Sequence, residues 1–227
     1  MFTKLTEQLK ANPRTIVFTE GTDARILDAA AKLTAENVLN VILLGAEDEV
    51  NAAAKEAGYD IAKCQIVDPE KYADIDAMVD EMVALRKGKM TADEVRAALA
   101  KSNYFGTMLV KMGKADCLLG GATYSTADTV RPALQLIKTK PGNKIVSSCF
   151  IMVKGDKKLA MGDCAINIAP NEDELTEIAI ETAKTAKVFG IDPKVAMLSY
   201  STYGSGKGDM VTLVANATKK VKETAPD

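Results

Sequence analysis

The 227-residue sequence contains no histidine. Histidine supplies the base of serine and cysteine hydrolase triads and the ligands of HExxH zinc sites, so its absence excludes these mechanisms. Any proton transfer must therefore use Asp, Glu, Lys, Tyr or Cys. Substrate binding would depend on Arg, Lys, hydroxyl groups and backbone N–H groups.

Other features are scarce as well. The four cysteines show no CxxC spacing, which predicts reduced thiols in a cytoplasmic protein. No apolar run approaches the ~18 residues of a membrane span, and the N-terminus has no signal-peptide core. The net charge of −2 gives no basic signal for nucleic acid. We therefore expect a cytoplasmic globular protein with no metal, no nucleic-acid partner and no membrane contact.

Alternation of short β-branched runs with helical stretches is the main pattern before residue 140. This pattern predicts βαβ units and a mainly parallel sheet. The predicted strands are residues 15–18, 38–44, 65–67 and 115–119, and the predicted helices are 24–36, 48–57, 74–87, 91–100 and 125–138.

The turn cluster Lys140–Asn143 predicts a boundary between two α/β domains, residues 1–142 and 143–227. Beyond it, Lys154-Gly155-Asp156 between two apolar runs indicates a β-hairpin. Asn171, followed by a glutamate at capping-box spacing, indicates a helix start. The predicted elements of this part are strands 144–153, 157–161 and 195–199 and helices 172–189 and 210–221.

Four segments are expected at the carboxyl ends of strands, where α/β sheets bind ligands. Glu20 and Asp23 lie beside a helix start, which favours capping over a functional role. The GGATYST run after residue 119 suits an anion, and it suits a plain strand-to-helix turn equally well. The four segments are residues 20–23, 120–126, 147–149 and 201–208.

The loop Ser201–Gly208 is not a Walker A motif. That motif requires GxxxxGK followed by Ser or Thr, whereas Ser201 stands five positions before Gly206 and Lys207 is followed by Gly208. Hydrolysis of a nucleoside triphosphate is therefore unsupported. A looser phosphate-binding nest of backbone N–H groups remains an alternative.

Four further residues have ordinary structural explanations. Arg86 ends a predicted helix, where a cation complements the helix dipole. Arg131, two turns into another helix, could stay solvated or reach a phosphate. Cys149 and Cys164 lie in strand-like surroundings and are expected to be inert thiols.

Six segments, taken in order, make the chain resemble the phosphate acetyltransferases (phosphotransacetylases) over essentially all of its length. Phosphate acyltransferases that prefer butyryl groups fit these segments less well. The resemblance implies two three-layer α/β/α domains with mainly parallel sheets, an active site in the interdomain cleft, and a homodimer. The segments are IVFTEGTDARIL, LRKGKMTADEVR, TADTVRPALQLIKTKPG, IVSSCFIM, GDCAINIAPNEDELTEIA and LSYSTYGSGKG.

The same resemblance implies transfer of an acetyl group between acetyl phosphate and coenzyme A. The coenzyme A thiolate would attack acetyl phosphate directly in a ternary complex, and phosphate would leave without a covalent acyl-enzyme. Coenzyme A is then a substrate, and no tightly bound cofactor is expected. The alternatives are an inactive fragment that binds coenzyme A or phosphate, an enzyme for a longer acyl chain, and a chain completed by a segment from another chain.

By motif position, Arg86 and Arg131 match the family arginines that bind the phosphates of coenzyme A. Cys149 is expected to be the thiol in the cleft, although Cys164 is an alternative. The residues expected to line the substrate site are Ser125, Thr126, Ser147, Ser148, Cys149, Thr202, Gly204, Ser205 and Lys207.

The sequence departs from the family in one respect. Family members are longer, and their C-terminal segment completes the first domain and carries an NDLSRG-type motif. The serine, arginine and aspartate assigned there to acetyl phosphate binding and thiol deprotonation have no counterpart in this sequence, which ends at Asp227. The catalytic residues are therefore unassigned, and Glu20, Asp128 and Asp163 are weak candidates for the base.

Overall fold

A computed structural model describes residues 2–202 and 204–226. The chain forms two compact units, Met1–Lys138 and Thr139–Asp227. The division falls just before the turn cluster at which the sequence places its boundary. The domain limits 1–142 and 143–227 stay a prediction, and each unit is described by itself below.

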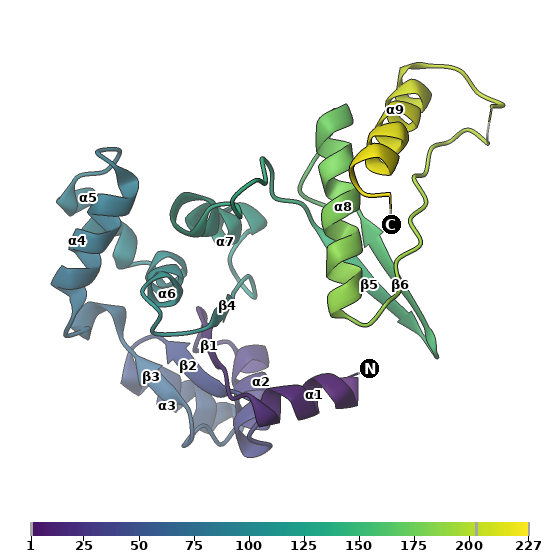
Figure 1. The fold of residues 1–227 in the computed structure, drawn as a ribbon. Coiled ribbons are helices and arrows are strands. Elements are labelled where there is room, and N and C mark those ends of the chain that lie inside the picture. Colours follow the sequence, from purple (N-terminus) through teal and green to yellow (C-terminus); the bar gives the residue numbers. More distant parts are fainter. Residues whose placement is uncertain (1, 203, 227) are drawn as a thin grey trace. The chain divides into compact units, whose positions relative to one another are not determined.

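A four-stranded parallel sheet forms the centre of the first unit (Figure 1), in the order β3-β2-β1-β4. Val17 is the register partner of Ile42 on one side and of Leu118 on the other. The parallel sheet predicted from the sequence is thus confirmed in this unit. The strands are β1 (Thr15–Phe18), β2 (Asn40–Leu44), β3 (Gln65–Val67) and β4 (Cys117–Leu119).

Helices cover both faces of this sheet (Figure 1). Alternate strand residues face opposite sides: Val17 packs into one buried cluster with α4, α5 and α6, and Phe18 into another with α2 and α3. The three-layer arrangement is therefore present in this unit. The helical elements are α1 (Phe2–Ala11), α2 (Ala24–Ala35), α3 (Glu47–Ala57), η1 (Pro69–Lys71), α4 (Ile75–Arg86), α5 (Ala92–Leu99), α6 (Ser102–Lys111), α7 (Thr126–Pro132) and the π-helical turn η2 (Ala133–Ile137).

Helix α6 is an element that the sequence analysis did not predict. Its buried residues Phe105, Met108 and Leu109 have the i, i+3, i+4 spacing of a helix face. Gly106 interrupts that pattern, but here it lets the helix approach the sheet. A Cβ on Gly106 would lie 2.8 Å from a methyl carbon of Leu118. Tertiary packing thus makes use of a residue that weakens a helix in isolation.

The second unit contains an antiparallel hairpin and two helices. The predicted hairpin is confirmed: Gly155, with φ of 58°, occupies the left-handed conformation that a two-residue turn requires. The predicted capping box at Asn171 is confirmed as well. The elements are β5 (Cys149–Lys154), β6 (Lys157–Gly162), α8 (Glu172–Val188) and α9 (Asp209–Thr224).

The strand predicted at residues 144–153 begins only at Cys149, and the prediction of a strand at residues 195–199 is wrong. The described strands of this unit are antiparallel and do not form the mainly parallel sheet that was expected. Residues 144–148 precede β5 instead of belonging to it, because side chains, and not a neighbouring strand, form hydrogen bonds with the backbone groups of residues 144–146. Glu177 accepts the N–H groups of Lys144 and Ile145, and Asn167 donates to the carbonyl oxygen of Val146. Residues 195–199 are irregular, since the ladder partners of β6 all lie on β5. An apolar run becomes a strand only where a neighbouring backbone is available.

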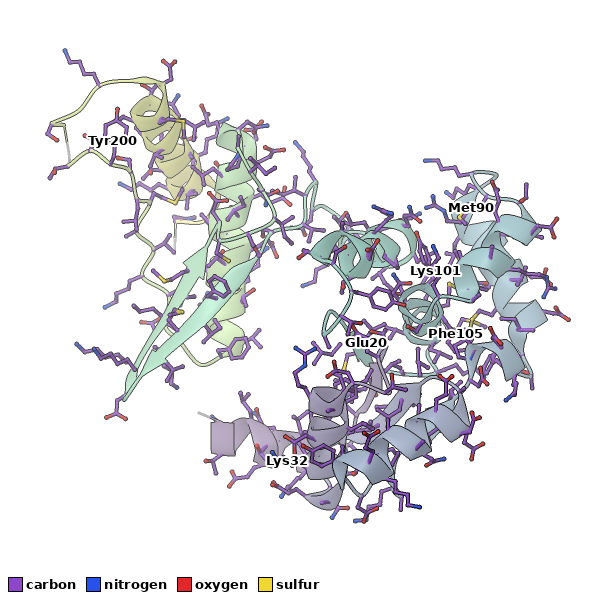
Figure 2. All side chains as sticks on the ribbon, turned by 180° about the vertical axis from the view of Figure 1, so that it is seen from behind. Glu20, Lys32, Met90, Lys101, Phe105 and Tyr200 are labelled. Carbon is purple, nitrogen blue, oxygen red and sulfur yellow. The ribbon has the colours of Figure 1, made fainter. Side chains whose placement is uncertain are left out.

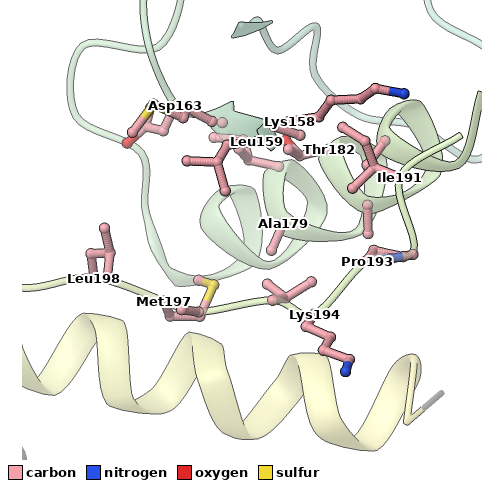
Figure 3. Close-up of a pocket in the computed structure, with 18 of the residues that line it drawn as sticks. Lys158, Leu159, Asp163, Ala179, Thr182, Ile191, Pro193, Lys194, Met197 and Leu198 are labelled. Carbon is pink, nitrogen blue, oxygen red and sulfur yellow. The ribbon is translucent and has the colours of Figure 1, made fainter. Parts of the chain in front are cut away.

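A cavity of about 620 Å³ lies between β6, α8 and the irregular segment 191–198 (Figure 3). Its lining is largely apolar and includes Leu159, Ile178, Ala179 and Met197. None of the residues predicted for substrate or coenzyme A binding lines it. None of the described helices has both the length and the apolar character of a membrane span.

Candidate functional site

Glu20, directly after β1 and Thr19, is the centre of a hydrogen-bonded loop cluster in the first unit (Figure 2). Its side chain is buried, with 8% exposed. Oε1 accepts the backbone N–H groups of Thr123 at 2.7 Å and Tyr124 at 3.0 Å, and Oε2 accepts that of Gly121 at 3.1 Å. The hydroxyl groups of Thr19 and Thr123 also donate to the carboxylate. The loop after β4 therefore encloses this carboxylate.

The charge of Glu20 is stabilised by these bonds. Burial by itself raises the pKa of a carboxyl group, but the backbone N–H groups of Thr123 and Tyr124 and the hydroxyl of Thr19 outweigh it, so the pKa of Glu20 is lowered. A carboxylate whose oxygens already accept several hydrogen bonds is a poor proton acceptor. The structure thus argues against Glu20 as a catalytic base.

The sequence of residues 120–126 suited an anion and a plain strand-to-helix turn equally well, and in the structure the N–H groups of this loop do bind an anion. That anion is the chain's own Glu20. Gly121 supports the turn with φ of 103°, a conformation that favours glycine. The sequence analysis placed segments 20–23 and 120–126 near one another, which is confirmed, but it did not pair Glu20 with the loop.

Asp23 caps α2, as predicted. Its Oδ1 accepts the backbone N–H of Arg25 at 2.9 Å, and the guanidinium of Arg25 bonds to both carboxylate oxygens. The same guanidinium donates to the carbonyl oxygen of Ala122 at 2.7 Å. The Arg25 side chain lowers the pKa of Asp23 to about 2. Asp23 and Arg25 thereby tie the start of α2 to the loop after β4.

We expect the stability contributed by Asp23 to be lost in acid. A carboxyl group whose folded pKa lies below its unfolded value of about 3.9 stabilises the fold above that value. This contribution falls as the pH drops toward about 2. Asp23→Asn should lower the unfolding midpoint at pH 7 and flatten its decline between pH 4 and 2, as measured by denaturant unfolding at each pH. Asp80→Asn, an exposed change on α4, is the control, and superimposable profiles for Asp23→Asn and the parent would contradict the expectation.

Ser125 and Thr126, predicted for the substrate site, lie at the start of α7. Ser125 caps this seven-residue helix: its Oγ accepts the N–H of Asp128 at 3.2 Å and donates to the Asp128 carboxylate at 2.7 Å. Thr126 is the exposed first residue of the helix. The hydroxyl of Ser125 therefore has a structural partner, and Asp128, a weak candidate for the base, accepts its hydrogen bond.

Arg131 belongs to the segment formed by α7 and η2, and Arg86 contacts this segment from α4. Arg131 lies in α7 with its side chain 58% exposed, and its nearest carboxylate oxygen, on Asp128, is 4.0 Å away. Arg86 ends α4 and is half-buried; its Nη1 donates to the carbonyl oxygen of Gln135 at 3.4 Å. The Nε of Arg86 is buried and has no hydrogen-bond partner within the described residues. One guanidinium group thus belongs to this helical segment and a second contacts it, and the second has a buried N–H without a partner among the described residues.

In the second unit, strand β5 begins at Cys149, and Ser147 and Ser148 directly precede it. The Oγ of Ser148 accepts from the Sγ of Cys164 at 3.4 Å and from the N–H of Ile166 at 3.3 Å. Cys149 is the first residue of β5, opposite Gly162, and is half-buried. These two serines lie before the strand and not in its middle, which corrects the sequence prediction. The structure brings Cys149 and Cys164 to the same end of the hairpin.

The loop Ser201–Gly208 binds its own backbone. The Oγ of Ser201 accepts the N–H of Gly206 at 2.8 Å, and the hydroxyls of Ser201 and Ser205 donate to the carbonyl oxygen of Thr202. A Cβ on Gly206 would lie 2.6 Å from the Oγ of Ser201, so this position requires glycine. The predicted site residues Thr202, Gly204, Ser205 and Lys207 are exposed here, whereas Tyr203 lies outside the described residues.

The sequence analysis missed the first turn of α6, which contacts the segment from Tyr124 to Gln135 through side-chain bonds. Consecutive polar residues within an otherwise apolar stretch were the available signal. Within residues 2–202 and 204–226, no three His, Cys, Asp or Glu side chains cluster as metal ligands would.

Comparison with known proteins identifies what this arrangement is similar to. The profile of the family "Phosphate acetyl/butaryl transferase" matches residues 1–227. A phosphate acetyltransferase of Bacillus subtilis (strain 168) is 51% identical over 227 residues, which are 100% of this chain and 70% of that protein.

Two solved structures share the fold. A phosphotransacetylase from Streptococcus pyogenes aligns with a TM-score of 0.94 and 47% identity over 100% of this chain and 69% of that one. The EutD phosphotransacetylase from Staphylococcus aureus aligns with a TM-score of 0.91 and 46% identity over 99% of this chain and 68% of that one. Each of these relatives is longer than the chain described here.

Proposed function

Since the chain belongs to the phosphate acetyl/butaryl transferase family, we propose that it transfers an acetyl group between acetyl phosphate and coenzyme A. The observation that supports this proposal is the pair of guanidinium groups around α7 and η2. Arg131 is exposed, and Arg86 has a buried Nε with no partner among the described residues. Guanidinium groups bind phosphates with strong, directional hydrogen bonds, and coenzyme A carries several phosphates.

The proposed reaction is a direct displacement. A base takes the proton of the coenzyme A thiol, and the thiolate attacks the carbonyl carbon of acetyl phosphate. A carbon–sulfur bond forms, the bond from the carbonyl carbon to the phosphate oxygen breaks, and inorganic phosphate leaves with the electron pair. Positioning of two anionic substrates by arginines, hydroxyls and N–H groups can supply much of the rate without histidine.

Roles within this scheme are proposed from the family resemblance together with the chemistry of each group. Arg86 and Arg131 are assigned to the phosphates of coenzyme A. Glu20 is not assigned as the base, because its oxygens accept the hydrogen bonds of the loop after β4. The remaining proposed site residues, which offer hydroxyls, a thiol, backbone N–H groups and an ammonium, are Ser125, Thr126, Ser147, Ser148, Cys149, Thr202, Gly204, Ser205 and Lys207.

The test is formation of acetyl-CoA from acetyl phosphate and coenzyme A by the 227-residue chain at high concentration, with coenzyme A binding measured in parallel. Turnover above a no-protein blank is expected, with acetyl phosphate preferred over butyryl phosphate. A preference for butyryl phosphate would assign a longer acyl chain. Binding without turnover would make the chain a coenzyme A-binding protein that lacks a base, and absence of binding would overturn the proposal.

Bound coenzyme A should protect Cys149 from alkylation. Desulfo-coenzyme A is the ligand to use, because it has no thiol to consume the reagent. The modification rate of Cys149 by N-ethylmaleimide, followed by peptide mass spectrometry, should fall several-fold when this ligand is saturating. Cys117, exposed on β4 in the other unit, is the internal control whose rate should not change. An unreactive or unprotected Cys149 would assign it to packing.

A further inference from the structure

The first turn of α6 is hydrogen-bonded to residues 124–135. This segment carries Arg131, and its residue Gln135 contacts Arg86. Figure 2 labels Lys101 and Phe105, which flank this turn. Each of its first three residues forms a bond to that segment. Ser102 Oγ lies 3.0 Å from the hydroxyl of Tyr124, Asn103 donates to the carbonyl oxygen of Asp128 at 2.8 Å, and the hydroxyl of Tyr104 donates to Oε1 of Gln135 at 3.0 Å.

Gln135 connects Tyr104 to Arg86. It lies in the π-helical turn η2, which ends at Ile137, so its carbonyl oxygen belongs to the last turn, where intrahelical donors run out. The Nη1 of Arg86 donates to this oxygen, while Tyr104 holds the side-chain amide of the same residue. The position of the guanidinium thus depends on a turn whose conformation Tyr104 helps to fix. π-Helical turns of this kind are frequent at functional sites.

We propose that Tyr104 is a positioning residue for coenzyme A binding, which acts through Gln135 on the guanidinium of Arg86. This inference rests on the proposed function, because it needs Arg86 to bind coenzyme A. Tyr104 packs against the buried cluster that contains Val17, and its hydroxyl donates to Gln135. Removal of that oxygen therefore loosens η2 and leaves the packing intact.

Tyr104→Phe is the variant that tests the link. Loss of one neutral hydrogen bond corresponds to a change in dissociation constant of about 2- to 12-fold. We expect the dissociation constant for coenzyme A, measured by calorimetry, to rise within this range. The thermal midpoint should fall by no more than the few degrees that loss of one hydrogen bond causes. Where turnover is measurable, kcat and the KM for acetyl phosphate should stay near those of the parent. A merely structural role would lower the thermal midpoint and leave the dissociation constant for coenzyme A unchanged.

Two further measurements sharpen the test. In an Arg86→Ala background, Tyr104→Phe should cause no additional loss of affinity, whereas its effect should add to that of Arg131→Ala, because Gln135 connects Tyr104 to the guanidinium of Arg86. Tyr72→Phe is the matched control: it removes a hydroxyl from another tyrosine packed on α6, through an edge-on contact with Phe105. That variant should bind coenzyme A like the parent.

The outcomes separate this inference from the proposed function. If the parent binds coenzyme A and Tyr104→Phe binds it equally well, Tyr104 is not a positioning residue and the proposed function stands. The same holds if Tyr104→Phe weakens binding as much in the Arg86→Ala background as in the parent. If the parent does not bind coenzyme A, both are overturned.

Discussion

Arg131→Ala should raise the dissociation constant for coenzyme A about 10- to 100-fold, the range expected when a hydrogen bond to a charged group, about 1.5–3 kcal/mol, is lost. Arg131 lies in α7 with more than half of its side chain in solvent, and its ion pair with Asp128 is long at 4.0 Å. Surface pairs of this kind add little to stability. The variant should therefore fold normally and lose affinity alone, as measured by calorimetry at fixed ionic strength.

The matched control is Arg14→Ala. Arg14 is also an exposed arginine with a carboxylate partner, Asp116 at 2.9 Å, but it precedes β1 at the amino ends of the strands. Ligands of parallel sheets bind at the opposite edge. Arg14→Ala should leave coenzyme A binding unchanged. Unaltered affinity in Arg131→Ala, or equal losses in the two variants, would remove Arg131 from the proposed site.

Glu20→Ala should destabilise the first unit by about 2–4 kcal/mol, because it leaves three backbone N–H groups of the loop after β4 without their acceptor. These groups belong to Gly121, Thr123 and Tyr124. The expected fall in thermal midpoint is about 2–4 °C per kcal/mol. Amide hydrogen exchange gives a local measurement, since protection should be lost at these three residues first.

Glu56→Ala is the control for Glu20→Ala, since Glu56 is an exposed glutamate on α3. It should change stability by no more than about 0.5 kcal/mol. Glu20→Gln keeps the shape but provides one acceptor oxygen in place of two, so its stability should lie between those of the parent and Glu20→Ala. A Glu20→Ala protein as stable as the Glu56→Ala protein would show that water can replace the carboxylate.

The local elements of this protein follow from local sequence. Asp23, the Gly155 turn and the Asn171 capping box are signals in which a side chain or a permissive backbone acts on residues within one turn of itself. Such interactions are complete before distant parts of the chain meet. The parallel sheet of the first unit could be predicted for a related reason: parallel neighbouring strands need a long crossover connection, usually a helix, and helical stretches alternate with the strands in this sequence.

The features that the sequence could not predict depend on strand pairing and hydrogen bonds between residues far apart in the chain. The strand-like run at residues 195–199 finds no ladder partner within the described part of the chain. At residues 144–145 the backbone N–H groups bond to the carboxylate of Glu177 and not to a neighbouring strand. In the candidate site, too, some features could be predicted from the sequence and others only from the tertiary structure. The family resemblance selected Arg86 and Arg131, and the sequence of residues 120–126 suited an anion or a plain turn equally well, but only the tertiary structure shows that Glu20 is the anion bound by that loop. Likewise, Tyr104 reaches Arg86 only through Gln135, because hydrogen bonds between residues 31 or more positions apart exist only once the fold brings them together.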